Sequence, residues 1–547
     1  MKGHSVFPCL LVVALGWLFG HVRSAGASPA SWLKIEADEF VVYSDAPPKQ
    51  VIECALRYAA FRRVFSEMFV PRGSSLPPSV LLIFRTAKSF KAMTRPANSR
   101  YSEIDNYFAE VDGTPFKAFA LDGDRDSALD ETFQFETIWA LQRVNDSIPI
   151  WMAQGAGEVL ATVSISEGKC VVGEKGDYPF SEMFPWPGFF KTNKDKWVFE
   201  NARELGYLQG QAWGLLHWVL LNDSATGEHF KTLALRLRNS AALDAIAAEM
   251  NTDADDLSKA ISHHLSHNRV RTIPFDETSA RARLLPVPAP DVEVFVQETN
   301  LLRANSLFAQ SDALLEKARA MAPDLPMVKE AQARRLCHNG EVEEAIRLYR
   351  EAIAGGSKDV MAYLLSASAR LDDLRTGDRD VAGGGGMASR RSVEELRQAI
   401  KLSPGDGEAF RLLGRAFFVQ PKITDAEVAE LSPGIVAGES GGAVRYYRAL
   451  LYSRLGRMGE SYADLRGIIS DPLLPDELRG TAKRALSSEI LKADARRIQT
   501  FLQEKNYSAA RATVRAAEAG PDDESVLRAY QRLNSIIDEQ EAAGAAH

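Results

Sequence analysis

The chain has 547 residues, of which 46% are hydrophobic and 25% are charged, so it is long enough for two or more domains that each bury a core. Its formal net charge is -8 and no long run of like charge stands out, which argues against a nucleic-acid-binding protein and against a charged tail. We therefore expect no nucleic-acid partner.

Residues 1–27 are typical of a secretory signal peptide. Lys2 precedes an apolar stretch over residues 6–19, and the small residues Ala25 and Ala27 suit a cleavage site. The apolar stretch is short for a membrane-spanning helix, and a retained N-terminal anchor is the alternative. We expect an exported, periplasmic or extracellular protein with no stable membrane span after removal of the signal.

The cysteines give no sign of a disulfide framework or of a metal site. Beyond the signal the chain has Cys54, Cys170 and Cys337, an odd number without the spacing of metal ligands. Cys9 lies too early to be the lipid-bearing cysteine of a lipoprotein.

Apolar patterns predict a small α+β region at the start of the mature chain. The expected elements are a strand over residues 32–44, a helix over 50–69, a buried strand over 79–84, a helix that begins near Lys88 and edge strands over 107–121. The acidic turn that follows lacks the spacing of an EF-hand loop, so we interpret it as a solvated turn.

Residues 128–158 are the part on which the functional interpretation depends. Residues 128–144 contain neither Gly nor Pro and begin with acidic side chains, which predicts a helix, and a second helix follows after a short turn. At about 100° per residue, Phe135 and Trp139 share a broad apolar face with Glu136. Because burial of an unpaired carboxylate is costly, Glu136 needs either a partner, such as an arginine or a backbone N–H, or a chemical role.

This stretch resembles the zinc-dependent gluzincin peptidases, and in particular the bacterial peptidase-MA-like domains. That family carries H-E-x-x-H on a helix, followed by Pro-(Leu/Ile)-Trp-(Leu/Met)-x-Glu-Gly-x-Ala-Glu. The corresponding segments here are residues 135–139 and 149–158. The residues that match the family pattern are Glu136, Pro149, Trp151, Gly155 and Glu158.

The zinc ligands of that pattern are replaced. Phe135 and Trp139 stand at the histidine positions, and neither ring offers an in-plane lone pair. Gln154 stands at the third ligand position, although the ligand spacing of the aminopeptidase branch would place Glu158 there, and one carboxylate alone makes no zinc site. The resemblance therefore implies a degenerate metallopeptidase with no metal and no cofactor, in which Phe135, Trp139 and Gln154 form an aromatic-filled pocket.

The resemblance covers residues 31–270 and implies an α+β gluzincin-like domain, with a small mixed sheet and a helical subdomain. A helix over 207–218 matches another family helix and favours His217 as a packed residue rather than a ligand. His263, His264 and His267 form a dense histidine cluster, in which His263 and His267 are one helical turn apart and could share a metal, but no acidic residue lies at zincin spacing. Because histidines also suit a helix C-terminus, we expect no metal there.

Two loop-rich segments follow the central motif. Residues 164–200 are rich in proline and aromatic residues, which indicates either the lining of a substrate cleft or an aromatic cover over the helical subdomain. Residues 271–294 contain Pro274, Pro286, Pro288 and Pro290, so we expect an extended linker and a domain boundary there.

The rest of the chain is expected to be an all-α tetratricopeptide-repeat solenoid over residues 295–535. Related segments begin at Ala318 and Ala352, 34 residues apart, and a third copy at Ala399 is displaced by a further 47 residues. A Gly-rich insertion over 376–388 accounts for the excess. Turn-like segments at 339–345, 455–461 and 505–510 fit the connections between paired helices. We expect about four to six degenerate repeats, which stack to bury faces that no single repeat buries.

Two functions are compatible with these patterns. We favour an exported bacterial protein that is not an enzyme, in which a catalytically inactive peptidase-like domain is joined to a solenoid that binds a protein or peptide partner in the cell envelope. The alternative is a hydrolase with altered, metal-independent chemistry, in which Glu136 and Glu158 act as an acid/base pair.

Overall fold

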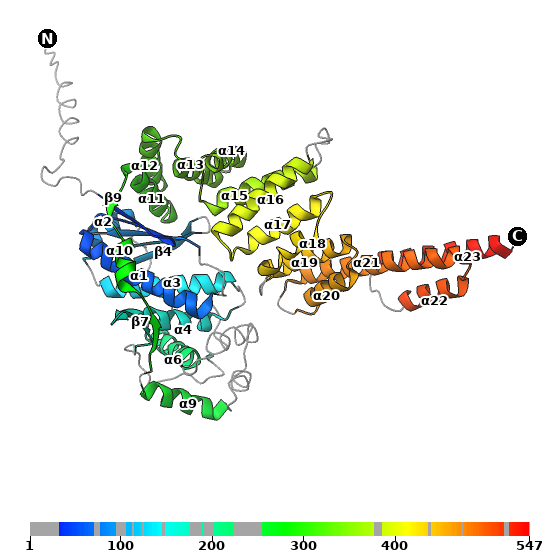
Figure 1. The fold of residues 1–547 in the computed structure, drawn as a ribbon, viewed down its shortest axis with the longest axis horizontal. Helices are drawn as coiled ribbons and strands as arrows, with labels where there is room; N and C mark the ends of the chain where they lie inside the picture. The colour runs from blue at the N-terminus through cyan, green and yellow to red at the C-terminus, as the bar shows by residue number, and fades with distance from the viewer. Residues whose placement is uncertain are drawn as a thin grey trace, which may run out of the picture.

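The computed structural model describes residues 32–70, 77–94, 106–111, 114–122, 125–144, 148–174, 189, 202–221, 254–267, 269–376, 385–435, 439–471, 474–518 and 524–545. A small mixed sheet with covering helices forms the N-terminal part, and a long series of helices leads from it to the C-terminus (Figure 1). The expected order of an α+β part followed by a helical part is confirmed at this level.

The first sheet has the strand order β4-β5-β3-β2-β1-β9. Its strands are β1 (Leu33–Glu36), β2 (Phe40–Ser44), β3 (Ser79–Phe84), β4 (Asn106–Val111), β5 (Thr114–Ala120) and β9 (Val287–Pro288). Strands β2, β3 and β5 run parallel to one another, whereas β4, β1 and β9 pair antiparallel with their neighbours.

Two strand predictions need correction. A single strand over 32–44 is wrong, because the backbone turns where Ala37 N donates to Phe40 O at 2.9 Å, and β1 and β2 form an antiparallel pair. Residues 107–121 supply only one edge strand, because β5 lies inside the sheet between β3 and β4. The predicted strand over 79–84 is confirmed as β3.

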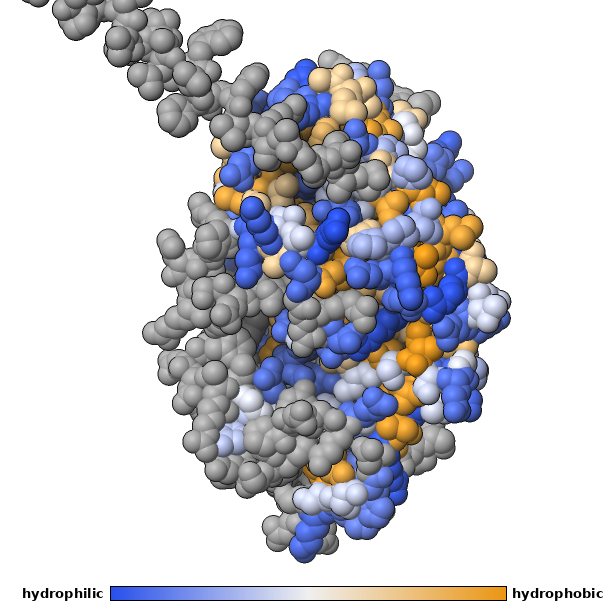
Figure 2. Space-filling view, turned by 90° about the vertical axis from the view of Figure 1, so that its left-hand side faces the viewer, coloured by the Kyte–Doolittle hydropathy of each residue, from blue (hydrophilic) through white to orange (hydrophobic). Residues whose placement is uncertain are grey.

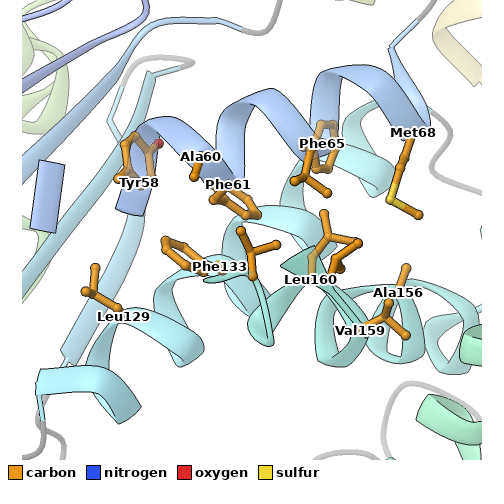
Figure 3. Packing of buried hydrophobic residues seen from close by; sticks show 14 of the residues in the cluster. Tyr58, Ala60, Phe61, Phe65, Met68, Leu129, Phe133, Ala156, Val159 and Leu160 are labelled. Atoms are coloured by element: carbon orange, nitrogen blue, oxygen red, sulfur yellow. The ribbon is translucent and has the colours of Figure 1, made fainter. Parts of the chain in front are cut away.

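Helices cover both faces of this sheet. On one face the helices are α1 (Pro48–Phe69), α3 (Arg125–Val144), α4 (Ile150–Ala161) and α6 (Ala202–Leu221), which share the largest core with the sheet. Figure 3 shows side chains of α1, among them Phe61 and Phe65, packed against Phe133 of α3 and Leu160 of α4. On the other face, α2 (Ala87–Met93) and α11 (Asp291–Ala304) pack on the strands. The predicted helices over 50–69, 128–144 and 207–218 are confirmed.

The Pro-rich segment over 271–294 is built into both sheets rather than being a free linker. Its first strand, β8 (Arg271–Pro274), pairs with β7 (Lys169–Val172), which in turn pairs with β6 (Ser164–Ser166) in a second sheet. After α10 (Glu277–Arg283), strand β9 pairs with β1 of the first sheet. The predicted loop over 164–200 thus begins as a hairpin, and nearly all of the rest of it lies outside the described residues.

From α11 onward, successive helices pack on one another. They are α12 (Phe308–Met321), α13 (Pro326–Asn339), α14 (Val342–Ala354), α15 (Val360–Thr376), α16 (Gly385–Leu402), α17 (Gly407–Val419), α18 (Asp425–Ala429), α19 (Glu439–Arg454), α20 (Met458–Ile469), α21 (Asp476–Gln503), α22 (Tyr507–Glu518) and α23 (Glu524–Ala545). The three related segments found in the sequence lie at the C-terminal ends of α12, α14 and α16. Each segment therefore forms the end of the second helix of a pair, the pairs being α11 with α12, α13 with α14 and α15 with α16.

The predicted connections between helices are turns in the structure. Gly340 follows α13 and Gly456 follows α19, with positive φ angles of 84° and 76° that glycine adopts without steric cost. Lys505, between α21 and α22, has a φ of 57°. The predicted Gly-rich insertion over 376–388 begins at the last residue of α15 and ends within α16, and its residues 377–384 lie outside the described part of the chain.

The described surface on the side of the sheet is mixed in character. Figure 2 shows hydrophilic residues with smaller apolar areas between them on this face. Within the described ranges, no helix combines the length and the apolar character that a membrane crossing requires.

Candidate functional site

Glu136 lies on the buried side of α3, where its side chain is only 2% exposed. Its Oε1 accepts hydrogen bonds from Arg62 Nη1 at 3.0 Å and from Ser79 Oγ at 3.2 Å. Its Oε2 accepts a hydrogen bond from Tyr58 Oη at 2.6 Å and lies 2.6 Å from Lys117 Nζ. Two cations and two hydroxyls therefore surround one carboxylate, and we call these five residues the Glu136 cluster.

Regular secondary structure brings this cluster together from four elements, which are α1, β3, β5 and the helix α3 that carries Glu136 itself. Tyr58 and Arg62 are one turn apart on α1, so both reach the same side of that helix. Ser79 is the first residue of β3. Lys117 lies on β5 next to Phe116 and Ala118, which pack on the α2 side of the sheet, so strand alternation directs Lys117 toward α1 and α3.

The charges of the cluster keep Glu136 ionised. Burial by itself would raise the pKa of Glu136, but Lys117 and Arg62 outweigh burial and hold that pKa below its ordinary value. Burial lowers the pKa of Lys117 to about 8, against the attraction of Glu136. Arg62 also donates to Glu39 Oε2 at 3.2 Å, so a second carboxylate balances the second cation.

This arrangement explains why a carboxylate stands on the buried side of the helix. Of the two explanations that the sequence left open, the structure supports a partnered glutamate, with Arg62 as one of the partners. A general base needs access to its substrate and a pKa near the working pH. Glu136 has neither, because it is enclosed and its negative charge is stabilised by fixed cations.

Phe135 and Trp139 lie on a different side of α3 from Glu136. The sequence placed Phe135 on the apolar face, but its side chain is 42% exposed, because the buried side is centred on Leu129, Phe133 and Glu136. The rings of Phe135 and Trp139 each lie 6.4 Å from the ring of Phe108 on the edge strand β4. Trp139 Nε1 donates to Glu110 Oε2 at 2.6 Å.

Gln154 and Glu158 lie one turn apart on α4. Gln154 Nε2 donates to Glu158 Oε1 at 3.0 Å, and Gln134 Nε2 donates to the same oxygen from α3. Gln134 and Glu136 are two residues apart and hence about 200° apart around the helix axis. Glu158 therefore contacts the side of α3 that faces away from the Glu136 cluster. A pocket formed jointly by Phe135, Trp139 and Gln154 stays a prediction.

Close helix packing explains the glycines of this motif. A side chain at Gly155 would place its Cβ 2.4 Å from the backbone oxygen of Ala212 on α6, and one at Gly157 would lie 2.9 Å from the backbone oxygen of Gln134 on α3. Helix α4 thus approaches α6 closely at Gly155 and α3 closely at Gly157, because neither residue has a side chain. The glycine at position 155, which matches the family pattern, has a packing role here.

The residues at the family's zinc positions do not fit a zinc ion. Phe135 and Trp139 have no nitrogen lone pair to offer, and the indole N–H of Trp139 is a donor. Gln154 uses its amide to donate to Glu158. Across the described ranges, no group of three or more His, Cys, Asp or Glu residues is arranged to hold a metal.

One histidine of α9 (Ala254–Ser266) pairs with a histidine of α6, and the sequence did not indicate this pair. His264 is buried, and its Nε2 lies 2.8 Å from Nδ1 of His217 on α6. His217 Nε2 lies 2.8 Å from the backbone oxygen of Gly173. His263 and His267, which the sequence singled out, are exposed and lie with ring centroids 4.4 Å apart. His217 is thus a packed residue, as expected.

A cavity of about 470 Å³ lies between the edge strand β4 and the helical part of the chain. Its lining combines Glu110 of β4 with residues of three helices. They are Val360, Met361, Leu364, Leu365 and Ser368 of α15, Asp406 just before α17, Gly407, Glu408 and Leu412 of α17, and Ser440 of α19. Glu110 is the residue that accepts the hydrogen bond from Trp139. Trp139 is therefore connected to the lining of this cavity by one hydrogen bond.

Sequence reasoning missed the partners of Glu136 and the whole cavity. One signal was available: Lys117 stands alone in the otherwise apolar segment of residues 115–120, where a charged side chain needs a partner. Arg62 similarly interrupts the apolar side of α1. Neither signal tells which carboxylate the cation meets. No comparable signal marks Glu110, because an exposed glutamate on an edge strand is common.

Comparison of the chain with protein-family models gave no match, and comparisons with curated proteins and with solved structures gave no significant similarity either.

Proposed function

We propose that this chain is an exported, catalytically inactive peptidase-like protein that binds segments of partner proteins in the cell envelope through its helical repeats. The observation that carries the proposal is the Glu136 cluster. The carboxylate at the position of the family's general base is buried between two cations, and aromatic residues occupy the positions of the two histidine ligands.

The hydrolase alternative has less support. Two carboxylates act together in hydrolysis when they face one cleft and their pKa values are pushed apart. Glu136 projects from one side of α3, and Glu158 contacts the opposite side of that helix through Gln134; their side chains are 2% and 6% exposed. The pKa of Glu136 lies below its ordinary value, which suits neither an acid nor a base near neutral pH.

The helical part supports a binding role. Paired helices of similar length follow one another from α11 to α16, and three related segments close the second helix of each pair. Such stacks typically present an extended surface to a partner. The cavity of about 470 Å³ between β4 and α15 falls within the size range of ligand pockets, roughly 300 to 1,000 Å³.

The test is binding without cleavage. The purified chain is mixed with a reduced and alkylated, permanently unfolded protein, with and without added zinc, and the mixture is followed by calorimetry and by mass spectrometry. We expect saturable binding and no new fragments. Ser368→Trp, which places a large ring in the cavity lining, should reduce the binding. New fragments that disappear in a Glu136→Gln variant would establish the hydrolase instead.

A further inference from the structure

Helix α11 joins the sheet to the helical part of the chain, since it follows the last strand, β9, and precedes α12 (Figure 1). On one side of α11, Val294 and Leu301 are buried in a core that they share with the strands and α2. On another side, Val296 is buried in a core formed with α12 and α13. The helix is therefore packed against both parts of the molecule at once.

Two glutamates of α11 have very different surroundings. Glu293 accepts a hydrogen bond from Tyr43 Oη at 2.7 Å and pairs with Lys34 Nζ at 3.0 Å, so side chains of β2 and β1 stabilise its charge. Glu298 lies one turn beyond Val294 and is only 8% exposed. Within the described residues, Glu298 makes no hydrogen bond and no ion pair. The more deeply buried of the two carboxyl groups is thus the one without a partner.

The charged groups around Glu298 favour its neutral form. Those that act on it are Asp45, which directly follows β2, and Lys317 on α12. Burial and the negative charge of Asp45 raise the pKa of Glu298 to about 7, against the attraction of Lys317, which is exposed and screened by solvent. Asp45 is held in place because its Oδ1 accepts from the backbone N–H of Arg85 at 2.5 Å.

We propose that Glu298 makes the contact between α11 and the sheet dependent on pH. The neutral carboxyl brings no charge into the contact, so α11 stays packed below neutral pH. Once Glu298 has lost its proton, a buried charge without a partner lies near Asp45 and favours local opening of α11, which lets water hydrate both carboxylates. This inference goes beyond the proposed function and does not depend on it.

The direction and size of the effect follow from the two states of α11. In the packed state the pKa of Glu298 is about 7, and in the opened state it returns toward its ordinary value of 4.5. The packed state therefore binds the proton more tightly, and its advantage is lost as the pH rises through 7. The equilibrium constant for opening should rise about tenfold between pH 6 and pH 8 and stay constant above pH 8.

Hydrogen exchange of the full chain, followed by mass spectrometry, measures this opening once the intrinsic pH dependence of exchange is subtracted. We expect the exchange of α11 amides to rise about tenfold from pH 6 to pH 8 in the natural chain, and to show no such rise in Glu298→Gln, whose side chain stays neutral. A rise of the same size in Glu298→Gln, or no rise in the natural chain, would overturn the inference.

Two further variants separate Glu298 from its neighbours. Glu293→Gln is the matched control, because it is the same substitution on the same helix but removes a partnered carboxylate. It should open α11 more at every pH and keep the tenfold rise, whereas loss of the rise would assign the effect to Glu293 and overturn the inference. Asp45→Asn still accepts from Arg85 and leaves Glu298 in place, so it tests the inference even if Glu298→Gln does not fold. The rise should move to lower pH in this variant, and an unmoved rise would contradict the proposed interaction.

Discussion

Glu136 and Trp139 are less than one turn apart on α3, yet their surroundings differ in every respect. Glu136 is 2% exposed and is held by side chains of α1, β3 and β5. Trp139 is partly exposed, contacts the edge strand β4 and reaches the cavity through Glu110. One side of the helix is bonded into the core, and another side carries Trp139 at the edge of the sheet.

The difference fits the proposed function, in which a peptidase-like fold carries no peptidase chemistry. A zinc peptidase needs its glutamate and its metal ligands to face one open site. Here Glu136 is stabilised by protein cations and is part of the core. Phe135 and Trp139, which stand at the histidine positions of the resembled pattern, are aromatic and offer no metal-binding lone pair. The following substitutions test each side of the helix.

The largest effect is expected for Lys117→Met. It removes one of two cations from a buried carboxylate, so the free energy of unfolding should fall by about 3 to 5 kcal/mol. Urea unfolding followed by circular dichroism measures this loss. Lys329→Met is the matched control, because Lys329 also pairs with two carboxylates, Glu351 and Asp324, but on a surface where the loss should stay below about 1 kcal/mol. Equal losses in the two variants would contradict a structural role for the cluster.

A double-mutant cycle then tests whether Glu136 and Lys117 act as one unit. Glu136→Gln removes the buried charge, so Lys117→Met should cost about 2 kcal/mol less in that background than in the natural chain. The same urea unfolding experiment gives the coupling energy. Additive losses would show that Lys117 is stabilised by something other than Glu136.

A pH effect of similar size is expected from His264. Burial lowers its pKa to about 4, with His217, Arg269 and His267 adding positive charge nearby, whereas the unfolded chain has a histidine pKa of about 6.5. Because the unfolded state binds the proton more tightly, stability falls as the pH drops through this window. Between pH 7 and pH 5 the loss from this group should be about 2 kcal/mol.

Unfolding curves of His264→Gln at these two pH values check the assignment. The variant should lose less stability on acidification than the natural chain does. His263→Gln serves as the control, because it removes an exposed histidine from the same helix and leaves the buried pair intact. An identical pH dependence in all three proteins would rule out the buried histidine pair as its source.

The smallest effect on stability is expected on the cavity side of α3. Trp139→Phe keeps an aromatic ring but removes the N–H that holds Glu110, so it should cost about 1 kcal/mol of stability or less. Urea unfolding measures this loss. In a Glu110→Gln background the same substitution should have little further effect on stability, and a full additional loss would separate Trp139 from Glu110.

Local features of the fold could be predicted from the sequence, because they depend on neighbouring residues. The absence of Gly and Pro from residues 128–144 indicated α3, and the glycines at 340 and 456 marked turns between helices. The prediction of a single strand over 32–44 was wrong for a local reason too, because the polar residues in its middle allow a turn as well as a continuous strand. Helix pairing in the C-terminal part followed from the repeated segments.

The candidate site could not be predicted, because its contacts join distant parts of the chain. Glu136 meets Tyr58, 78 residues earlier, and His217 meets His264, 47 residues later. The sequence showed that Glu136 needed a partner, but it did not show which of several arginines and lysines that partner is. The cavity depends on how the sheet and α15 lie beside each other, and no residue pattern reports that arrangement.

The measurement that tests the central claim most directly is the zinc content of the purified chain by elemental analysis, beside the variant Phe135→His, Trp139→His, Gln154→Glu. We expect no stoichiometric zinc in the natural chain and zinc in the variant, since the variant restores the nitrogen and carboxylate ligands of the resembled family. Stoichiometric zinc in the natural chain would contradict the account, and His217 and His264 would be the first residues to examine as ligands.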